Sequence, residues 1–351
     1  MISVFSTDHA LHDATREYYN GMLAPLYDSP ARAMIIHDAV ERAGMGPILP
    51  PRSFSLEPIR AVHSDEYLAY LEHAYERWVA GGGTTLGVLP DTFAARWMAR
   101  RPTNPLAVPG YYAFDLCAPI VAGTYRAARS AAHVALTGAT LLRAGHQIVY
   151  ALCRPPGHHA GVAMYGGYCF LNNAAIAAEY LVQATARTHS ARTSHARRVA
   201  ILDIDFHHGN GTQQIFYTRS DVLFISIHAH PERQYPYFTG YADERGAEAG
   251  LGYTLNIPLE ARVTDEQYLG ALEQALAAIR DLAPDFLVLS AGFDTFGDDP
   301  IGDFALTSDV YPAIGRRIAA LGLPTLVVQE GGYALETLGA NVVGLLGGFE
   351  I

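Results

Sequence analysis

The segment DIDFHHGNG, residues 203–211, concentrates metal-binding side chains at the end of an apolar run. Alternation along an extended chain sends Asp203, Asp205 and His207 toward one face, so a carboxylate and an imidazole two residues apart can grip one cation. Burying these groups beside an apolar strand without a metal would carry a large desolvation cost. The segment therefore predicts a metal site.

A third ligand follows a second apolar run, in the segment SAGFDTFGDDP, where Asp294 comes directly after the predicted strand. Two carboxylates and one imidazole leave a tetrahedral Zn²⁺ one position for water and a substrate carbonyl. Asp298 and Asp299 compete for this role, but adjacent aspartates in a polar turn more often cap a loop. The same ligand atoms also suit Fe²⁺. We expect the metal ligands to be Asp205, His207 and Asp294.

Two further motifs follow predicted strands. CRPPGHHAG presents His158 and His159 behind a Pro-Pro-Gly turn, and imidazoles suit proton transfer because they titrate near the working pH. QEGGYAL places Tyr333 behind two glycines, where a phenol can donate a hydrogen bond to a developing oxyanion. Taken alone, a histidine pair on a loop or one of 21 tyrosines is more often structural. Their placement, which matches that of the metal motifs, favours catalysis.

The elements that must position these side chains can be predicted from short apolar runs and from helical periodicity. The runs predict strands, buried on both faces, at residues 2–6, 147–153, 198–205, 222–228, 253–258, 286–292 and 325–332. Helices are predicted at Ala31–Ala43, Thr124–Ala144, Asn172–Ala184, Asp265–Leu282 and Ser308–Leu321, the fourth behind a TDEQ capping box. This alternation predicts a mostly parallel sheet of about eight strands with helices on both faces. Sites in such sheets lie beyond the carboxyl ends of the strands.

The length of 351 residues allows one large α/β domain or two ordinary ones, and without a convincing linker we expect a single domain over residues 1–351. The Gly- and Pro-rich stretch at 80–110 is too long for an ordinary connection. It is predicted to shape the site or to form a subunit contact. The basic stretch at 185–198 is typical of a surface connector.

Composition limits the partners. A net charge of −11 opposes binding to nucleic acid and permits cationic small molecules. All 24 basic residues are arginine, so lysine Schiff bases, a pyridoxal phosphate anchor and a P-loop lysine are excluded. The N-terminus lacks a signal-peptide pattern and no run of 18 apolar residues occurs, so we expect no membrane span. Three scattered cysteines favour a reducing compartment, which together predicts a cytoplasmic protein.

In its four motifs and their order, the chain resembles the histone deacetylase and acetylpolyamine amidohydrolase family, which has the arginase-like α/β fold. The segments GGYCFLNNAA, LTSDVY and SPARAMIIHDAV extend the resemblance over most of the chain. It implies that Asp205, His207 and Asp294 bind zinc and that Tyr333 polarises the acetyl carbonyl.

The resemblance also implies separate roles for the two histidines. His159 takes a proton from the attacking water and later delivers it to the leaving amine, whereas His158 stays closer to cationic beside Asp203. Asn210 stands where many relatives carry a second aspartate. Its amide orients His159 without adding negative charge, which keeps that base neutral.

Other positions carry over from the same resemblance. Tyr168 and Tyr235 match the aromatic walls of a substrate tunnel, and Gly167 accepts the amide hydrogen through its carbonyl. A structural K⁺ or Na⁺ site takes side chains of Asp203 and Ser226 with carbonyls of Asp205, His207 and Ile227. A second cation site takes carbonyls of Phe216, Arg219 and Val222.

Within the family, the bacterial acetylpolyamine amidohydrolases look most similar, by REYYNG, by YERW and by the 80–110 insertion, which in those relatives builds a dimer that narrows the entrance. The expected reaction is therefore hydrolysis of acetylputrescine- or acetylcadaverine-type amides to acetate and free amine. Cys117 and Ile301 replace acidic residues of polyamine-acting relatives. This leaves Asp115 or Glu17 to meet the distal ammonium.

Three alternatives remain open. A broad acetyl-lysine deacetylase would share every catalytic residue, and Asp115 matches its backbone-holding aspartate as well. A dinuclear manganese ureohydrolase would want a second carboxylate where Thr295 and Phe296 follow Asp294. An inactive relative would only bind acetylated ligands.

Overall fold

The structure is a computed structural model that describes residues 1–183 and 198–350. Eight strands form one sheet in which every neighbouring pair is parallel. Across the sheet the order is β4 (Ile48–Leu49), β1 (Ile2–Phe5), β5 (Ile148–Leu152), β10 (Thr325–Gln329), β9 (Phe286–Ala291), β6 (Val199–Asp203), β7 (Val222–Ala229) and β8 (Thr254–Leu259). The predicted parallel α/β fold is confirmed, with all seven predicted strands and the short β4 in addition.

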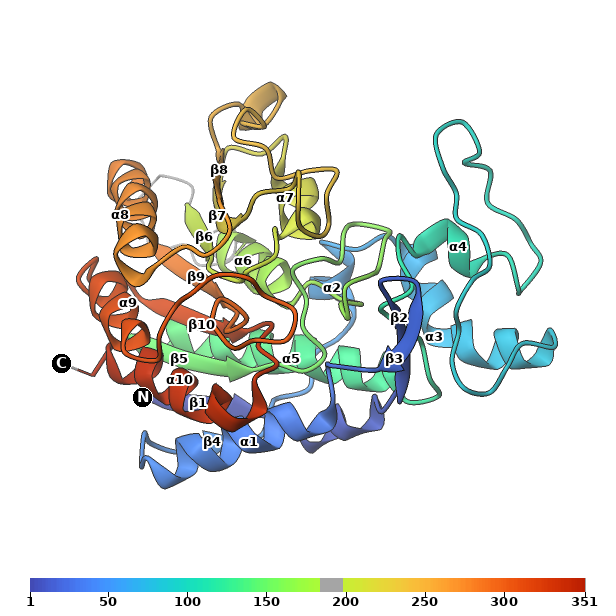
Figure 1. The fold of residues 1–351 in the computed structure, drawn as a ribbon, viewed down its shortest axis with the longest axis horizontal. Helices are drawn as coiled ribbons and strands as arrows, with labels where there is room; N and C mark the ends of the chain where they lie inside the picture. Colours follow the sequence, from blue (N-terminus) through green and yellow to red (C-terminus); the bar gives the residue numbers. More distant parts are fainter. Residues whose placement is uncertain (184–197, 351) are drawn as a thin grey trace.

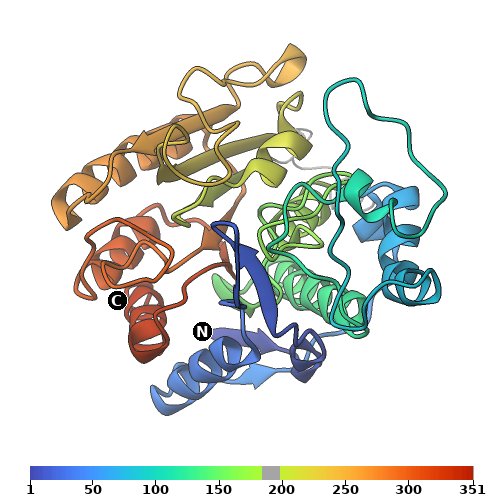
Figure 2. The same cartoon turned by 45° about the vertical axis from the view of Figure 1, so that its right-hand side comes forward.

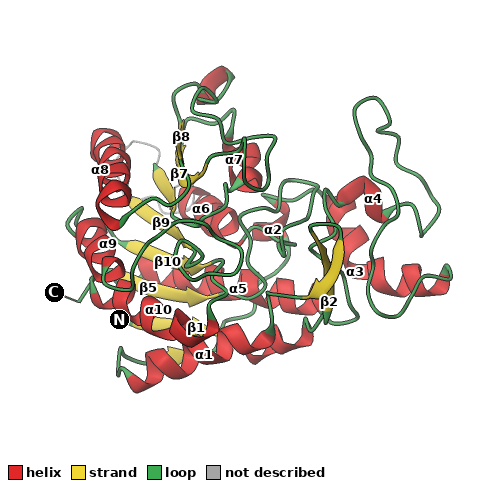
Figure 3. Ribbon diagram, viewed as in Figure 1, coloured by secondary structure: helices red, strands yellow, loops and turns green. Residues whose placement is uncertain are grey.

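Helices cover both faces of this sheet (Figures 1 and 3). Successive residues of one strand belong to different cores: Val199 and Ile201 of β6 pack into one, Ala200 and Leu202 into the other. The first core contains α5 and α6, and the second contains α1, α8, α9 and α10. Strands buried on both faces explain why their sequences are continuous apolar runs.

The five predicted helices are present with ends shifted by two residues or fewer. They are α1 (Pro30–Arg42), α5 (Thr124–Arg143), α6 (Asn173–Gln183), α8 (Asp265–Leu282) and α9 (Val310–Ala319). Gln267 Oε1 accepts a hydrogen bond from the Thr264 backbone N–H at 3.0 Å, as the capping-box pattern before α8 predicts. Further helices are α2 (Glu57–Arg60), α3 (Asp65–Ala80), α4 (Pro109–Tyr112), α7 (Asn210–Phe216) and α10 (Leu335–Gly347), with 3-10 turns at Thr7–Leu11 and Glu248–Gly250.

Two segments stand apart from the layered body. Most of the predicted 80–110 insertion, residues 81–108, runs as a long loop that projects beyond α3 and α4 (Figures 1 and 2). The antiparallel strands β2 (Arg16–Tyr19) and β3 (Met22–Pro25) form a hairpin whose Asn20–Gly21 turn has positive φ at both residues, as a tight two-residue hairpin loop requires. Except for Arg198, the basic stretch predicted as a surface connector lies outside the described residues.

Candidate active site

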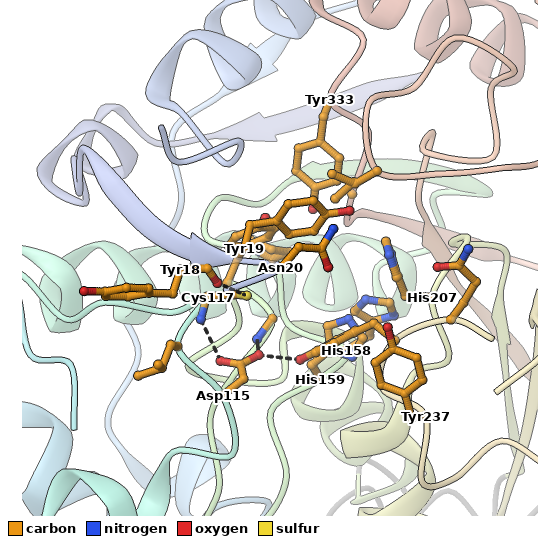
Figure 4. Close-up of a pocket in the computed structure, with 18 of the residues that line it drawn as sticks. Tyr18, Tyr19, Asn20, Asp115, Cys117, His158, His159, His207, Tyr237 and Tyr333 are labelled. Carbon is orange, nitrogen blue, oxygen red and sulfur yellow. Dashed lines mark hydrogen bonds between the residues drawn. The ribbon is translucent and has the colours of Figure 1, made fainter. Parts of the chain in front are cut away.

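The four chemical motifs follow β5, β10, β9 and β6, which are consecutive neighbours in the sheet. Their carboxyl ends therefore meet at one edge, where sites of parallel sheets form. A cavity of about 670 Å³ opens at this edge and is lined by His158, His159, His207 and Tyr333. Figure 4 shows the three histidines grouped together, with Tyr333 approaching from the opposite side.

The three predicted metal ligands are brought together. Ligand atoms of Asp205, His207 and Asp294 all lie within 4.8 Å of one another. His207 turns Nδ1 toward both acids, 2.9 Å from Asp294 Oδ2 and 3.3 Å from Asp205 Oδ1. All three side chains are buried, and the set combines two carboxylates with one imidazole, a donor set that suits Zn²⁺.

The electrostatics of these ligands also favour a cation. Burial and the negative charge of Asp205 raise the pKa of Asp294 to about 7. Burial disfavours the charged form of His207, but its hydrogen bonds to Asp205 and Asp294 outweigh that and raise its pKa to about 9. Two carboxylates and one imidazole are thus buried together. A divalent cation bound between them would neutralise the negative charge of the carboxylates.

The surrounding backbone fixes the carboxylates. Gly331 N–H donates to Asp205 Oδ2 at 2.9 Å, and Phe206 N–H donates to Asp294 Oδ1 at 3.0 Å. A Cβ atom at Gly331 would lie 2.7 Å from an oxygen of each acid. The first glycine of the QEGGYAL motif is therefore required by close approach to the metal ligands.

The tandem histidines have different partners. His158 Nδ1 lies 3.0 Å from Asp203 Oδ2, and His159 Nδ1 lies 2.7 Å from Asn210 Oδ1. Burial opposes the charge of His158, but Asp205 and Asp203 outweigh burial and raise its pKa to about 10. Burial, together with the positive charges of His158 and His207, holds the pKa of His159 well below its usual value. One ring is thus cationic and the other neutral.

Tyr333 is held from two sides. Asp299 Oδ2 accepts hydrogen bonds from the backbone N–H groups of Tyr333 at 2.6 Å and Ala334 at 3.1 Å. The Arg32 guanidinium lies 4.5 Å from the centre of the Tyr333 ring, and its Nε donates to the Gly332 carbonyl at 2.6 Å. Burial raises the pKa of Tyr333 well above its usual value, so the phenol keeps its proton for donation. Because Asp299 accepts hydrogen bonds from two backbone N–H groups, it caps the loop that precedes α10.

The predicted tunnel residues line the cavity, with one exception. Tyr168, Tyr235 and Gly167 are part of the wall, as are Asp115, Cys117 and Ile301. Asp115 Oδ2 accepts hydrogen bonds from Tyr235 Oη at 2.6 Å and from Gly167 N–H at 2.7 Å. The Cys117 backbone N–H donates to Asp115 Oδ1 at 3.0 Å, a contact marked in Figure 4.

Glu17 is the exception, because its carboxylate is fully buried and is not part of the cavity wall. Its oxygens accept hydrogen bonds from the Tyr168 hydroxyl at 3.0 and 3.1 Å and from the Tyr27 backbone at 3.1 Å. Burial raises its pKa to about 7. Glu17 thus supports the Tyr168 wall from behind, a position that the sequence alone did not reveal.

The residues predicted for monovalent cations lie at the end of β6, within β7 and in the connection that precedes β7. The register of these strands pairs Asp203 with Ser226, beside Ile227. Asp203 Oδ1 accepts from the Asp205 N–H at 3.1 Å, and Ser226 Oγ lies 2.8 Å from His228 Nδ1. The second set spans the connection from α7 to β7, where Arg219 N–H donates to Phe216 O at 3.0 Å and Val222 begins β7.

Sequence reasoning did not assign functions to Arg32 and Glu330. Both stand inside motifs that were singled out, SPARAMIIHDAV and QEGGYAL, but their partners lie far away in the chain. Arg32 also donates to the Glu330 carbonyl at 2.8 Å, and the Glu330 side chain reaches the loop of the tandem histidines. The signal available in the sequence was a charged side chain inside each of these motifs.

A parallel α/β sheet that carries this set of groups at its carboxyl edge defines a metal-dependent hydrolase. The chain belongs to the histone deacetylase family: the histone deacetylase domain matches residues 26–348. It is 46% identical to acetylpolyamine amidohydrolase 2 of Pseudomonas aeruginosa, over 100% of this chain and 99% of that protein. It is 44% identical to acetylpolyamine amidohydrolase of Mycoplana ramosa, over 98% of each chain.

A solved structure gives the same result for the fold. The crystal structure of acetylpolyamine aminohydrolase from Burkholderia pseudomallei superimposes with a TM-score of 0.91 at 40% identity. The match covers 99% of this chain and 98% of that one, so it includes the projecting insertion as well as the sheet.

Proposed function

We propose that this protein deacetylates acetylated polyamines or diamines of the acetylputrescine and acetylcadaverine type, releasing acetate and the free amine. The observation that carries the proposal is one cavity lined by His207, a neutral His159 and the protonated Tyr333, with the carboxylates of Asp205 and Asp294 buried beside His207. The substrate class is supported by full-length similarity to relatives named acetylpolyamine amidohydrolases.

Each residue of the site has a distinct part in this reaction. Asp205, His207 and Asp294 would hold Zn²⁺, with Fe²⁺ as the alternative, which when bound supplies Lewis-acid catalysis. His159 takes a proton from the attacking water through Nε2, because Nδ1 is engaged by Asn210, and returns it to the leaving nitrogen.

The remaining two groups act on charge in the transition state. Tyr333 donates its phenol hydrogen bond to the acetyl oxygen as negative charge develops there. His158, held cationic by Asp205 and Asp203, adds positive charge beside the reacting centre. Asp203, Ser226 and the neighbouring carbonyls are proposed to hold K⁺ or Na⁺, with Phe216, Arg219 and Val222 at a second site.

The composition of the cavity wall favours a cationic amine. Beyond the metal ligands, aromatic side chains dominate it, among them Tyr19, Phe93, Tyr168, Tyr235 and Tyr237. Asp115 is the carboxylate of this outer wall and is proposed to meet the distal ammonium, with Glu17 acting through Tyr168. Aromatic faces add cation–π attraction for an ammonium group.

The assembly and compartment are proposed from the same features. The insertion at 80–110 presents Leu86 and Trp97 with 76% and 88% of their surface exposed, which suits a homodimer contact. Phe93 of the same segment lines the cavity, so a contact there would reach the entrance. All three cysteines are free, which suits the cytoplasm. Among the described residues, no helix is both long and apolar enough to span a membrane.

The test is a comparison of kcat/KM on acetylputrescine, acetylcadaverine, acetylspermidine and an acetyllysine peptide. The proposal predicts that the acetylated diamines exceed the peptide. A higher value for the peptide would instead establish the broad acetyl-lysine deacetylase, the second candidate, for which Asp115 is equally well placed. No turnover of any of the four with the metal bound would overturn both.

A further inference from the structure

We propose that Glu330 is a positioning residue whose hydrogen bonds hold the tandem-histidine loop in its catalytic conformation. This inference rests on the proposed function. Glu330 follows β10, and its side chain reaches across to the loop that follows β5. Its Oε2 accepts hydrogen bonds from the backbone N–H groups of Gly157 at 2.7 Å and His158 at 3.2 Å.

The same carboxylate also reaches a third strand. Ser290, in β9, donates its hydroxyl to Glu330 Oε1 at 3.2 Å. One side chain therefore connects the carboxyl ends of β5, β10 and β9. Burying a carboxylate is costly, and here three donors offset that cost within the catalytic edge of the sheet.

The backbone around Glu330 ties this contact to the remaining catalytic groups. Gly331 N–H donates to the metal ligand Asp205, and the Glu330 carbonyl accepts from Arg32, which stacks on Tyr333. A shift of residues 330–331 would thus be transmitted to the base loop, a metal ligand and the oxyanion donor together. Displacements of about 1 Å in such sites can cost roughly a hundredfold in rate.

The side chain acts through backbone atoms and not on the substrate. Glu330 is fully buried and is not part of the cavity wall, whereas His158 and His159 are. Its two N–H contacts precede His159 by one and two residues, so they fix the direction in which the loop presents the base. This placement distinguishes Glu330 from a residue that merely fills the core.

The decisive comparison is between Glu330→Gln and Glu330→Ala. A glutamine can place its carbonyl oxygen where Oε2 lies and present its amide nitrogen to Ser290 Oγ, which can then accept. We expect Glu330→Gln to keep kcat within about threefold, whereas Glu330→Ala loses roughly tenfold to a hundredfold in kcat at little changed KM and metal content. Glu336→Ala, at an exposed position six residues on, is the matched control.

A second measurement does not depend on turnover. Backbone amide exchange of Gly157 and His158 should quicken in Glu330→Ala and stay slow in Glu330→Gln, because the acceptor is lost in one and kept in the other. Wild-type kcat in Glu330→Ala would overturn the inference, as would a glutamine variant as slow as the alanine variant or a kcat loss that merely parallels metal loss. Failure of the wild type to deacetylate amines would instead overturn the proposed function. The exchange result would still decide whether Glu330 holds the tandem-histidine loop.

Discussion

The two adjacent histidines differ in charge because Asp205 and Asp203 outweigh burial and stabilise the cationic form of His158, whereas burial and nearby positive charge disfavour the cationic form of His159. His158 faces the carboxylate of Asp203, whereas His159 faces the neutral amide of Asn210. A general base must be unprotonated at the working pH, and burial with nearby positive charge gives His159 that property. The choice of Asn at position 210 thus affects the pH range of the reaction.

Asn210→Asp tests this difference. A carboxylate beside His159 favours the protonated ring and therefore raises the pKa of His159. Because the base works only when neutral, activity lost on acidification should now be lost at higher pH. We expect the acidic limb of the profile of kcat/KM against pH to move to higher pH. An acidic limb at the wild-type pH would contradict the role of His159 as base. Asn210→Ser, which removes the contact without adding charge, is the control.

Tyr333→Phe tests the hydrogen-bond donor. The variant keeps the ring against Arg32 and the backbone contacts of Asp299, but it cannot donate to the acetyl oxygen. Loss of one oxyanion donor typically costs about a hundredfold to a thousandfold in kcat. Metal content by elemental analysis should equal that of the wild type. A phenylalanine variant as active as the wild type would refute the donor role.

The loops after the strands carry the chemistry, and their fit depends on small residues. Gly331 lies between the carboxylates of Asp205 and Asp294, where a Cβ would come within 2.7 Å of both. Neither acid can retreat freely, because each already accepts a backbone hydrogen bond. The loop after β10 and the metal ligands therefore leave no room for a side chain at position 331.

Gly331→Ala should accordingly lower metal content and activity together. The matched control is Gly270→Ala, because Gly270 lies within α8 and a Cβ there would meet nothing within 4 Å. At that position alanine should stabilise the protein by roughly 0.5–1 kcal/mol, since glycine is unfavourable inside a helix. Elemental analysis and thermal unfolding of both variants measure the two effects. Full metal loading of Gly331→Ala would show that the loop can relax.

At the scale of the whole molecule, the projecting insertion at 80–110 exposes large apolar side chains. Trp97 and Leu86 lie on it with most of their surface exposed, and Phe93 returns to the cavity. Large exposed apolar groups on one segment are typical of an interface. A dimer formed through this segment would link substrate selection to assembly.

Trp97→Glu should shift the protein from dimer to monomer in sedimentation velocity, because a charge would be buried at the proposed contact. The monomer should also act relatively better on an acetyllysine peptide, since the entrance would be wider. Leu251→Glu, at a residue with 68% of its surface exposed outside the insertion, should leave the assembly unchanged. A wild-type protein that sediments as a monomer would remove the basis for the dimer.

Several features could be predicted from the sequence alone. Seven strands and five helices follow from apolar runs and periodicity, because these patterns record local burial. The long helix α3 was missed although Ser64 caps it and Asp65 and Glu66 lie in its first turn, signals that are present in the sequence. The helix α10 was missed because it contains several glycines, which are unfavourable inside a helix. The motif residues that converge on the cavity were named in advance because their chemistry is unusual near apolar strands.

Only the tertiary structure decided which of these parts are neighbours. The order β5, β10, β9, β6 brings motifs from residues 158, 333, 294 and 205 to one edge, and nothing local in the sequence specifies that order. The same holds for Glu17 behind Tyr168 and for Arg32 and Glu330 beneath the site. The metal triad and its chemistry were thus predicted from residue types and spacing. The buried residues that support the site were not predicted, because long-range packing selects them through the free energy of the whole chain.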